Sequence, residues 1–65
     1  MNDLIVKFLE NKVDGDTIEN VRLTVTKGFG LDHVKTEERL DEMVEDGDLQ
    51  RFFISAEPRY AIDQP

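Results

Sequence analysis

Residues 32–62 read DHVKTEERLDEMVEDGDLQRFFISAEPRYAI, and this stretch decides the fold. Its first half predicts a helix over residues 33–46, because side chains suited to a core recur at spacings of three and four along one face. Those side chains are Thr36, Leu40, Met43 and Val44. We expect Gly47 to end the helix, since glycine enters the left-handed conformation after a helix without a Cβ clash.

The second half of the stretch predicts a β-hairpin. Residues 49–54 are mostly apolar and aromatic, which favours a strand, and residues 60–62 return as a second strand. We expect Glu57-Pro58 to form the turn between them, because proline is common in turns. The sequence therefore predicts a sharply ended helix followed by an antiparallel hairpin over residues 49–62.

An amphipathic helix is also predicted near the start of the chain, over residues 3–11. Its apolar stripe consists of Leu4, Ile5, Phe8 and Leu9, and Asn2 or Asp3 is the expected N-cap. The segment that follows is compatible with a short strand at Val13 and contains a turn signal at Asp14-Gly15.

The segment between these two helices is ambiguous in sequence. Asp16 as N-cap and Glu19 three residues later favour a helix over residues 17–27, and an apolar stripe supports it. That stripe consists of Ile18, Val21, Val25 and Phe29. Residues 22–26 also alternate with period two and contain strand-favouring side chains. We favour the helix, because the capping signal and the stripe agree; Gly28-Phe29-Gly30-Leu31 then forms a turn, and Asp32 caps the next helix.

Composition limits what the chain can be. Its 65 residues predict one small domain over residues 1–65, with a frayed tail at residues 63–65. It lacks cysteine and any long apolar segment, so we expect a cytoplasmic protein without disulfides. The formal net charge of −7 disfavours phosphate and lipid headgroups and favours a basic partner.

The predicted element order resembles the winged helix-turn-helix family. The resemblance is carried by the turn GFGL at residues 28–31 and by the run LDEMVEDGDLQR at residues 40–51, which leads from the third helix into the hairpin. It implies an α+β fold of three helices and a C-terminal β-hairpin wing, and a role in transcription regulation. In such proteins the third helix commonly enters the DNA major groove and the wing touches phosphates.

Charge departs from the DNA-binding pattern of that family. Residues 31–48 hold eight acidic and two basic residues, so nearly the whole acidic excess falls on the expected recognition helix. Carboxylates there would face the phosphate backbone, whereas affinity for DNA depends on several Lys or Arg contacts. The sequence therefore favours docking against a basic protein surface over reading DNA.

Two sets of candidate site residues follow from these alternatives. For protein contact we expect the acidic helix face and the wing, namely Glu38, Glu42, Arg51, Phe52, Phe53 and Arg59. For DNA binding, the matching positions are Lys27, His33, Lys35, Arg39, Arg51 and Arg59. Adjacent strand residues point to opposite faces, so only one of the two neighbouring phenylalanines can face the core.

Catalytic chemistry is not expected. The chain has one histidine, His33, one serine, Ser55, and no cysteine, so neither a nitrogen or sulfur metal site nor a nucleophilic triad can be assembled. We predict no cofactor and no metal. The expected function is a non-enzymatic regulatory module acting on transcription or replication machinery by protein contact. The alternatives are a sequence-specific DNA-binding regulator working as a dimer, and a structural subunit.

Overall fold

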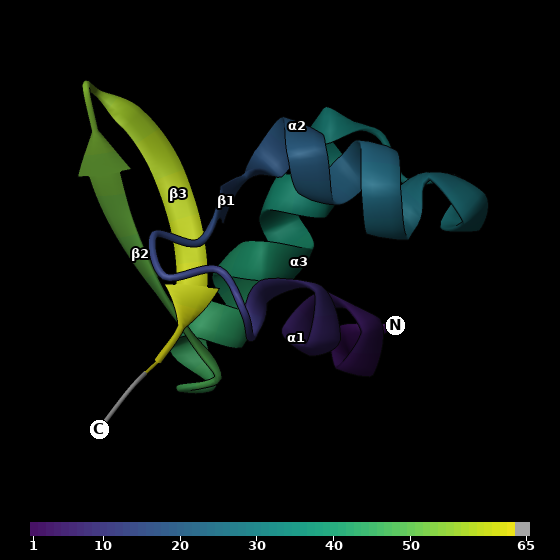
Figure 1. The fold of residues 1–65 in the computed structure, drawn as a ribbon. Helices are drawn as coiled ribbons and strands as arrows, with labels where there is room; N and C mark the ends of the chain where they lie inside the picture. Colours follow the sequence, from purple (N-terminus) through teal and green to yellow (C-terminus); the bar gives the residue numbers. More distant parts are fainter. Residues whose placement is uncertain (64–65) are drawn as a thin grey trace.

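The structure is a computed structural model that describes residues 1–63, which fold into short helices and one sheet (Figure 1). The elements are α1 (Asn2–Leu9), β1 (Asp16–Thr17), α2 (Ile18–Val21), η1 (Arg22–Thr26), η2 (Lys27–Phe29), α3 (His33–Glu45), β2 (Leu49–Ile54) and β3 (Glu57–Ile62). Because α2, η1 and η2 follow without a break, they act as one helical segment. The architecture of the described chain is α+β, with the predicted winged helix-turn-helix layout.

The strands form an antiparallel sheet in the order β1-β3-β2, which flanks the helices on one side (Figure 1). The short strand β1 sets Asp16 opposite Tyr60 and therefore lies three residues beyond the position expected from Val13. Val13 itself is 96% exposed in the loop before β1. Pairing with β3 creates this strand, and such long-range pairing leaves no local pattern in sequence.

The hairpin turn differs from the prediction. Glu57 and Pro58 lie inside β3, and the turn consists of Ser55 and Ala56, whose φ angles are +52° and +68°. A two-residue turn with both φ angles positive matches the twist of paired strands. Ile54 and Glu57 form the hydrogen-bonded pair that closes the turn, so the nitrogen of the next residue, Pro58, points away from β2. Proline is tolerated there because the pairing with β2 needs no N–H from this residue.

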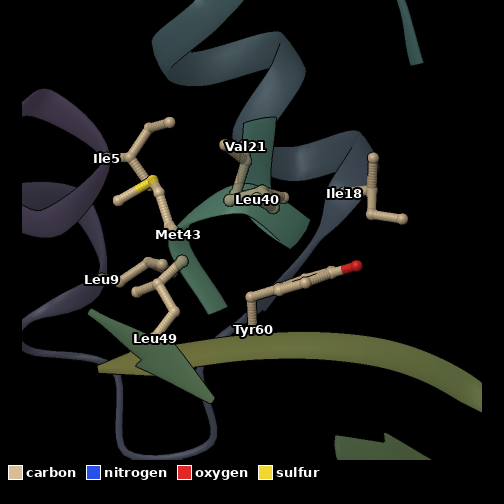
Figure 2. Close-up of a cluster of buried hydrophobic side chains, with 8 residues drawn as sticks. All are labelled: Ile5, Leu9, Ile18, Val21, Leu40, Met43, Leu49 and Tyr60. Atoms are coloured by element: carbon tan, nitrogen blue, oxygen red, sulfur yellow. The ribbon is translucent and has the colours of Figure 1, made fainter. Parts of the chain in front are cut away.

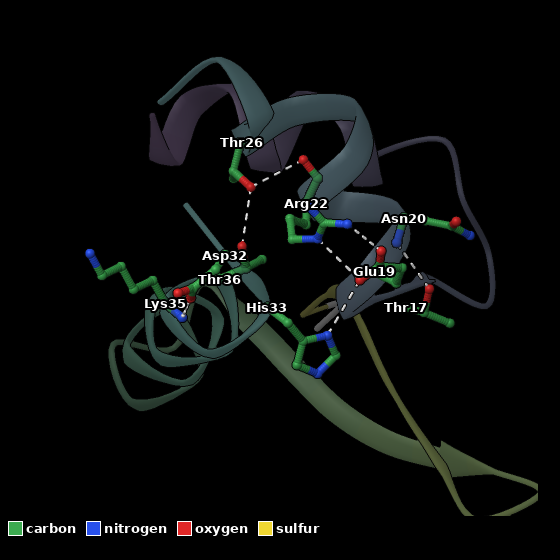
Figure 3. Close-up of polar contacts among 9 residues, drawn as sticks. All are labelled: Thr17, Glu19, Asn20, Arg22, Thr26, Asp32, His33, Lys35 and Thr36. Atoms are coloured by element: carbon green, nitrogen blue, oxygen red, sulfur yellow. Dashed lines mark hydrogen bonds and ion pairs between the residues drawn. The ribbon is translucent and has the colours of Figure 1, made fainter. Parts of the chain in front are cut away.

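The ambiguous segment is helical, as favoured from the sequence, but not as a regular α-helix. Residues Arg22–Thr26 form a π-helical turn and Lys27–Phe29 a 3₁₀ turn. The π turn contains more residues than an α turn, so the stripe drifts out of phase, and Phe29 is 52% exposed instead of buried. The Thr26 hydroxyl is buried against the Thr36 hydroxyl at 3.1 Å, which ties this segment to α3 (Figure 3).

Of the N-caps predicted for the three helices, only that of α3 is confirmed. Asp32 caps α3 as expected, accepting from the Lys35 N–H at 2.8 Å (Figure 3). Helix α2 is capped by Thr17, not by Asp16. Burial favours a raised pKa of Asp16, but hydrogen bonds from Asn20 and from the Thr17 N–H outweigh it and lower that pKa. Asp16 therefore lies in β1, paired with β3, and its side chain accepts a hydrogen bond from Asn20 there.

Helix α1 begins one residue earlier than predicted. Its N-cap is Met1, whose carbonyl accepts from the Leu4 and Ile5 N–H groups at 3.0 and 3.2 Å, and no side chain caps it. Neither Asn2 nor Asp3 is the N-cap, contrary to prediction. The helix ends at Leu9, and the predicted residues after it form a turn. Leu4, placed in the apolar stripe, is 48% exposed.

The core lies between the helices and the sheet (Figure 2). It consists of Ile5, Leu9, Ile18, Val21, Leu40, Met43, Leu49 and Tyr60. Gly47 takes a φ of +86° after α3, as predicted, so the chain turns sharply from α3 into β2.

No helix in the described chain combines the length and apolarity of a membrane-spanning segment. Asp63 donates its N–H to the Asp48 carbonyl at 3.4 Å, and the rest of the predicted frayed tail, Gln64-Pro65, lies outside the described residues.

Candidate functional site

The face of α3 that points away from the core carries four of the predicted site residues. Burial of Thr36, Leu40 and Met43 fixes the rotation of the helix about its axis. The opposite face then forms a shallow hollow of about 230 Å³. Its lining consists of Leu31, Lys35, Glu38, Arg39 and Glu42. The structure therefore brings the acidic pair proposed for protein contact together with the basic pair proposed for DNA.

Charge is distributed unevenly along this face. Two carboxylates and two basic groups alternate in the hollow. Beyond it, Glu45 and Asp46 are exposed at the C-terminal end of α3, and the last turn contains no basic residue. The C-terminus of a helix carries partial negative charge, so these carboxylates add to the helix dipole instead of compensating it. The strongest negative field of α3 is therefore expected at its C-terminal end.

Helix α1 is linked to the hollow through Arg39. The Arg39 guanidinium donates through Nη1 to Asn2 Oδ1 at 3.4 Å, which directs this side chain toward the start of α1. Arg39 is half-buried, whereas Lys35 is exposed. Lys35 therefore presents its ammonium group on this face more openly than Arg39 presents its guanidinium.

His33 and Lys27 lie outside the hollow. His33 Nδ1 is 3.4 Å from Glu19 Oε2, so the first turn of α3 meets α2 (Figure 3). Arg22 also hydrogen-bonds Glu19, through Nε at 3.1 Å. The Arg22 hydrogen bond is the main reason that the pKa of the Glu19 carboxyl falls to about 2, and the contact with His33 adds to it. Lys27 is exposed in η2.

In the wing, Arg51 is engaged with α3. Its Nη1 lies 2.9 Å from Asp41 Oδ1, and the same oxygen accepts from the Tyr60 hydroxyl at 2.7 Å. Burial, reinforced by this hydrogen bond to Asp41, raises the pKa of Tyr60 to about 12. Tyr60 therefore remains a neutral donor at ordinary pH. One carboxylate of α3 thus joins both wing strands to the helix.

Arg59 holds the loop that precedes β1. Its Nε and Nη2 donate to the carbonyls of Asp14 and Gly15, both at 3.0 Å. Gly15 has a φ of +64°, and a Cβ there would lie 2.0 Å from the Tyr60 carbonyl oxygen. Only glycine allows the loop to lie this close to β3, and this close contact brings the loop carbonyls within reach of Arg59. Like that of Arg51, this guanidinium is bound within the protein.

The two adjacent phenylalanines take different environments. Phe53 is 63% exposed, on the strand face that also carries Leu49 and Arg51, and Phe52 is half-buried on the opposite face. Ile54 beside the turn is 44% exposed, and Val34 on α3 is 60% exposed. Sequence reasoning missed the last two. The unbroken apolar run FFI at residues 52–54 was the available signal for Ile54.

Other concave surfaces of the described chain offer less chemistry. A hollow of about 390 Å³ lies between the end of α1 and the strands, and one of about 190 Å³ lies where α2, α3 and β3 meet. Residues 1–63 contain no group of three or more acidic, histidine or cysteine side chains arranged to hold a metal ion.

Comparison with known proteins adds no relative: no family model, no curated protein and no solved structure matches this chain. The fold and the surface described above thus define a class only. The class is a small α+β domain with a winged-helix layout, an acidic third helix and wing arginines bound within the protein.

Proposed function

We propose that this protein is a non-enzymatic regulatory module that binds a basic surface on a protein of the transcription or replication machinery. The observation that carries the proposal is the engagement of both wing arginines by the protein itself. A guanidinium that is already hydrogen-bonded within the protein has fewer N–H donors left for a phosphate. The absence of cysteine fits action in the reducing cytoplasm.

The exposed face of α3 supports the same proposal. A helix in the major groove runs between two phosphate backbones, and counterion release rewards each basic group that meets a phosphate. Here Lys35 and Arg39 alternate with Glu38 and Glu42, and further carboxylates follow toward the C-terminus. The face would meet phosphates with more negative than positive groups. A partner rich in Lys or Arg complements it.

A second candidate function is sequence-specific DNA binding. It is favoured by the helix-turn-helix layout and by Lys35, which is exposed near the start of α3. Reading bases through the N-terminal half of the helix would keep the most acidic end away from the duplex. Dimerisation would double the number of basic contacts.

Charge reversal on α3 tests the proposal. The immobilised wild-type chain and the Glu38→Lys/Glu42→Lys variant are used to capture proteins from an extract of the source cells. The matched control is Glu10→Lys/Asp14→Lys, which changes net charge equally at exposed sites outside the hollow. A retained protein is then purified, and its association rate is measured at about 50 and 300 mM salt.

We expect a basic partner to associate about tenfold or more slowly with the α3 variant than with the control, and with a weaker salt dependence. Rim charges act mainly through electrostatic steering of association. Equal rates for the α3 variant and the control would refute the proposed surface. Loss of activity on a DNA reporter in Lys35→Ala, with partner capture unchanged, would favour DNA binding.

A further inference from the structure

Strand β2 lies at the free edge of the sheet. In the order β1-β3-β2, strand β3 is central, and no described element runs beside the outer side of β2 (Figure 1). The register between β2 and β3 is continuous from Leu49 opposite Ile62 to Ile54 opposite Glu57, so no bulge interrupts this edge. The strand contains neither proline nor lysine, two residues that commonly protect edge strands from pairing, and its one charged side chain, Arg51, is held by Asp41.

The turn determines which backbone groups of β2 are unpaired. A two-residue loop is closed by a hydrogen-bonded pair, here Ile54 with Glu57, and hydrogen-bonded pairs then alternate along the ladder. Residues 50, 52 and 54 therefore bond to β3. The N–H and C=O groups of Leu49, Arg51 and Phe53 point outward from the sheet. These groups accept another strand without any change in the fold.

We propose that two copies of this chain pair through β2, antiparallel and with the two-fold axis at Phe52, to form one continuous sheet. This interface goes beyond the proposed function, because it uses the sheet edge and leaves the exposed face of α3 free. The occupant that we propose for this edge is a second copy of the chain. A strand of another protein is the alternative, and the experiments below distinguish the two.

The side chains select this register. Residues whose backbone groups point outward must lie opposite each other in the two copies, so the register can change only in steps of two residues. A two-fold at Arg51 would set two guanidinium groups directly opposite, and like charges there are destabilising. A two-fold at Phe52 instead sets Arg51 opposite Phe53 of the second copy, so that the guanidinium meets an exposed aromatic ring.

On the other face of the sheet, the same register pairs Phe52 with Phe52 of the second copy. Gln50 then lies opposite Ile54 of the second copy, which is 44% exposed in the monomer. Aromatic and aliphatic cross-strand contacts of this kind stabilise antiparallel pairs. Shifting the axis to residue 50 or 53 would shorten the paired region, because the turn at residues 55–56 or the end of β2 intervenes.

Electrostatics predicts a salt-dependent equilibrium. Each copy carries a net charge of −7, so the approach of two copies is opposed at low ionic strength. The contact is a single strand pair and is small compared with a stable interface. Dimerisation is therefore expected to be weak and to strengthen as salt screens the repulsion.

Disulfide trapping tests the register, since the native chain has no cysteine. The oligomeric state of each variant is first checked by sedimentation. At about 0.5 M NaCl, Phe52→Cys should then oxidise to a disulfide dimer about tenfold or more faster than Gln50→Cys. Mixing Gln50→Cys with Ile54→Cys should restore rapid cross-linking, because these positions face each other across the axis. Equal oxidation rates for all single variants would overturn the proposed register.

A matched charge pair tests the contact without cysteine. Phe53→Glu and Phe53→Lys both remove the exposed ring, but only glutamate complements Arg51 of the second copy. By sedimentation equilibrium, Phe53→Glu should dimerise at least tenfold more tightly than Phe53→Lys. Net charge alone predicts the opposite order, since Phe53→Glu is the more acidic chain. That opposite order, or a wild-type chain that stays monomeric at millimolar concentration and high salt, would overturn the proposal and leave the edge to a foreign strand.

Discussion

Replacing Tyr60 by phenylalanine is expected to weaken the attachment of the wing to α3. The Tyr60 ring is fully buried and would be kept, so no cavity forms. The loss is the hydrogen bond from its hydroxyl to Asp41 Oδ1 at 2.7 Å, and bonds to charged groups contribute about 1.5–3 kcal/mol. Asp41 keeps Arg51 and remains 41% exposed, so solvent compensates part of this loss.

We therefore expect Tyr60→Phe to lower the free energy of unfolding by about 1–2 kcal/mol, which is at or below the lower end of that range because solvent compensates part of the loss. For a domain of this size that corresponds to a fall in melting temperature of roughly 4–16 °C. The assays are urea titration and thermal melting followed by circular dichroism. A double-mutant cycle with Asp41→Ala should show a coupling of at least about 0.5 kcal/mol.

The same variant has a pH signature. The folded pKa of Tyr60, about 12, lies above the ordinary value of 10.0, so the folded state holds this proton more tightly than the unfolded state does. This contribution to stability is complete below about pH 10 and is lost as pH rises toward 12. The wild-type advantage over Tyr60→Phe should shrink over that window. An advantage below about 0.3 kcal/mol at pH 7, or one unchanged at pH 12, would refute the role assigned to the hydroxyl.

Three further variants have defined outcomes. Gly15→Ala should cost about 3 kcal/mol or more in urea unfolding, because a left-handed φ and a Cβ 2.0 Å from the Tyr60 carbonyl oxygen both oppose it; an unchanged midpoint would contradict the close approach. Ser55→Asn with Ala56→Gly should raise the melting temperature, with about 1 kcal/mol gained at the two positive φ angles; a lower melting temperature would argue against this turn. Glu45→Lys should stabilise the fold by about 0.3–1 kcal/mol at low salt through the helix dipole, an effect that added salt should remove.

Local pattern was sufficient to predict α3 and its end. Core side chains at spacings of three and four, followed by glycine, define both the buried face of α3 and the turn into β2. The acidic outer face follows from the same periodicity, so the positions of Glu38 and Glu42 were predictable. The hairpin was predictable as an element because its residues favour strands.

Features set by long-range pairing could not be predicted. The turn fell at Ser55-Ala56, although proline at Pro58 gave the stronger local turn signal, because the register between β2 and β3 requires a two-residue loop. Strand β1 exists only because its backbone meets β3.

The wing arginines show the same limit at the candidate site. From sequence, Arg51 and Arg59 were free cations beside an exposed aromatic ring. In the fold, Asp41 and the carbonyls around Gly15 bind them, from positions ten and about forty-four residues away. No local pattern records such contacts, although they decide what the wing can bind.

The most direct test of protein contact over DNA binding is a salt titration with labelled random duplex DNA, followed by fluorescence anisotropy. With an acidic α3 and bound wing arginines, the dissociation constant at about 150 mM salt should be weaker than about 10⁻⁵ M, with a shallow salt dependence. Submicromolar binding with a log–log slope steeper than about −5, equivalent to six or more phosphate contacts, would contradict the proposal that this domain acts through a basic protein partner.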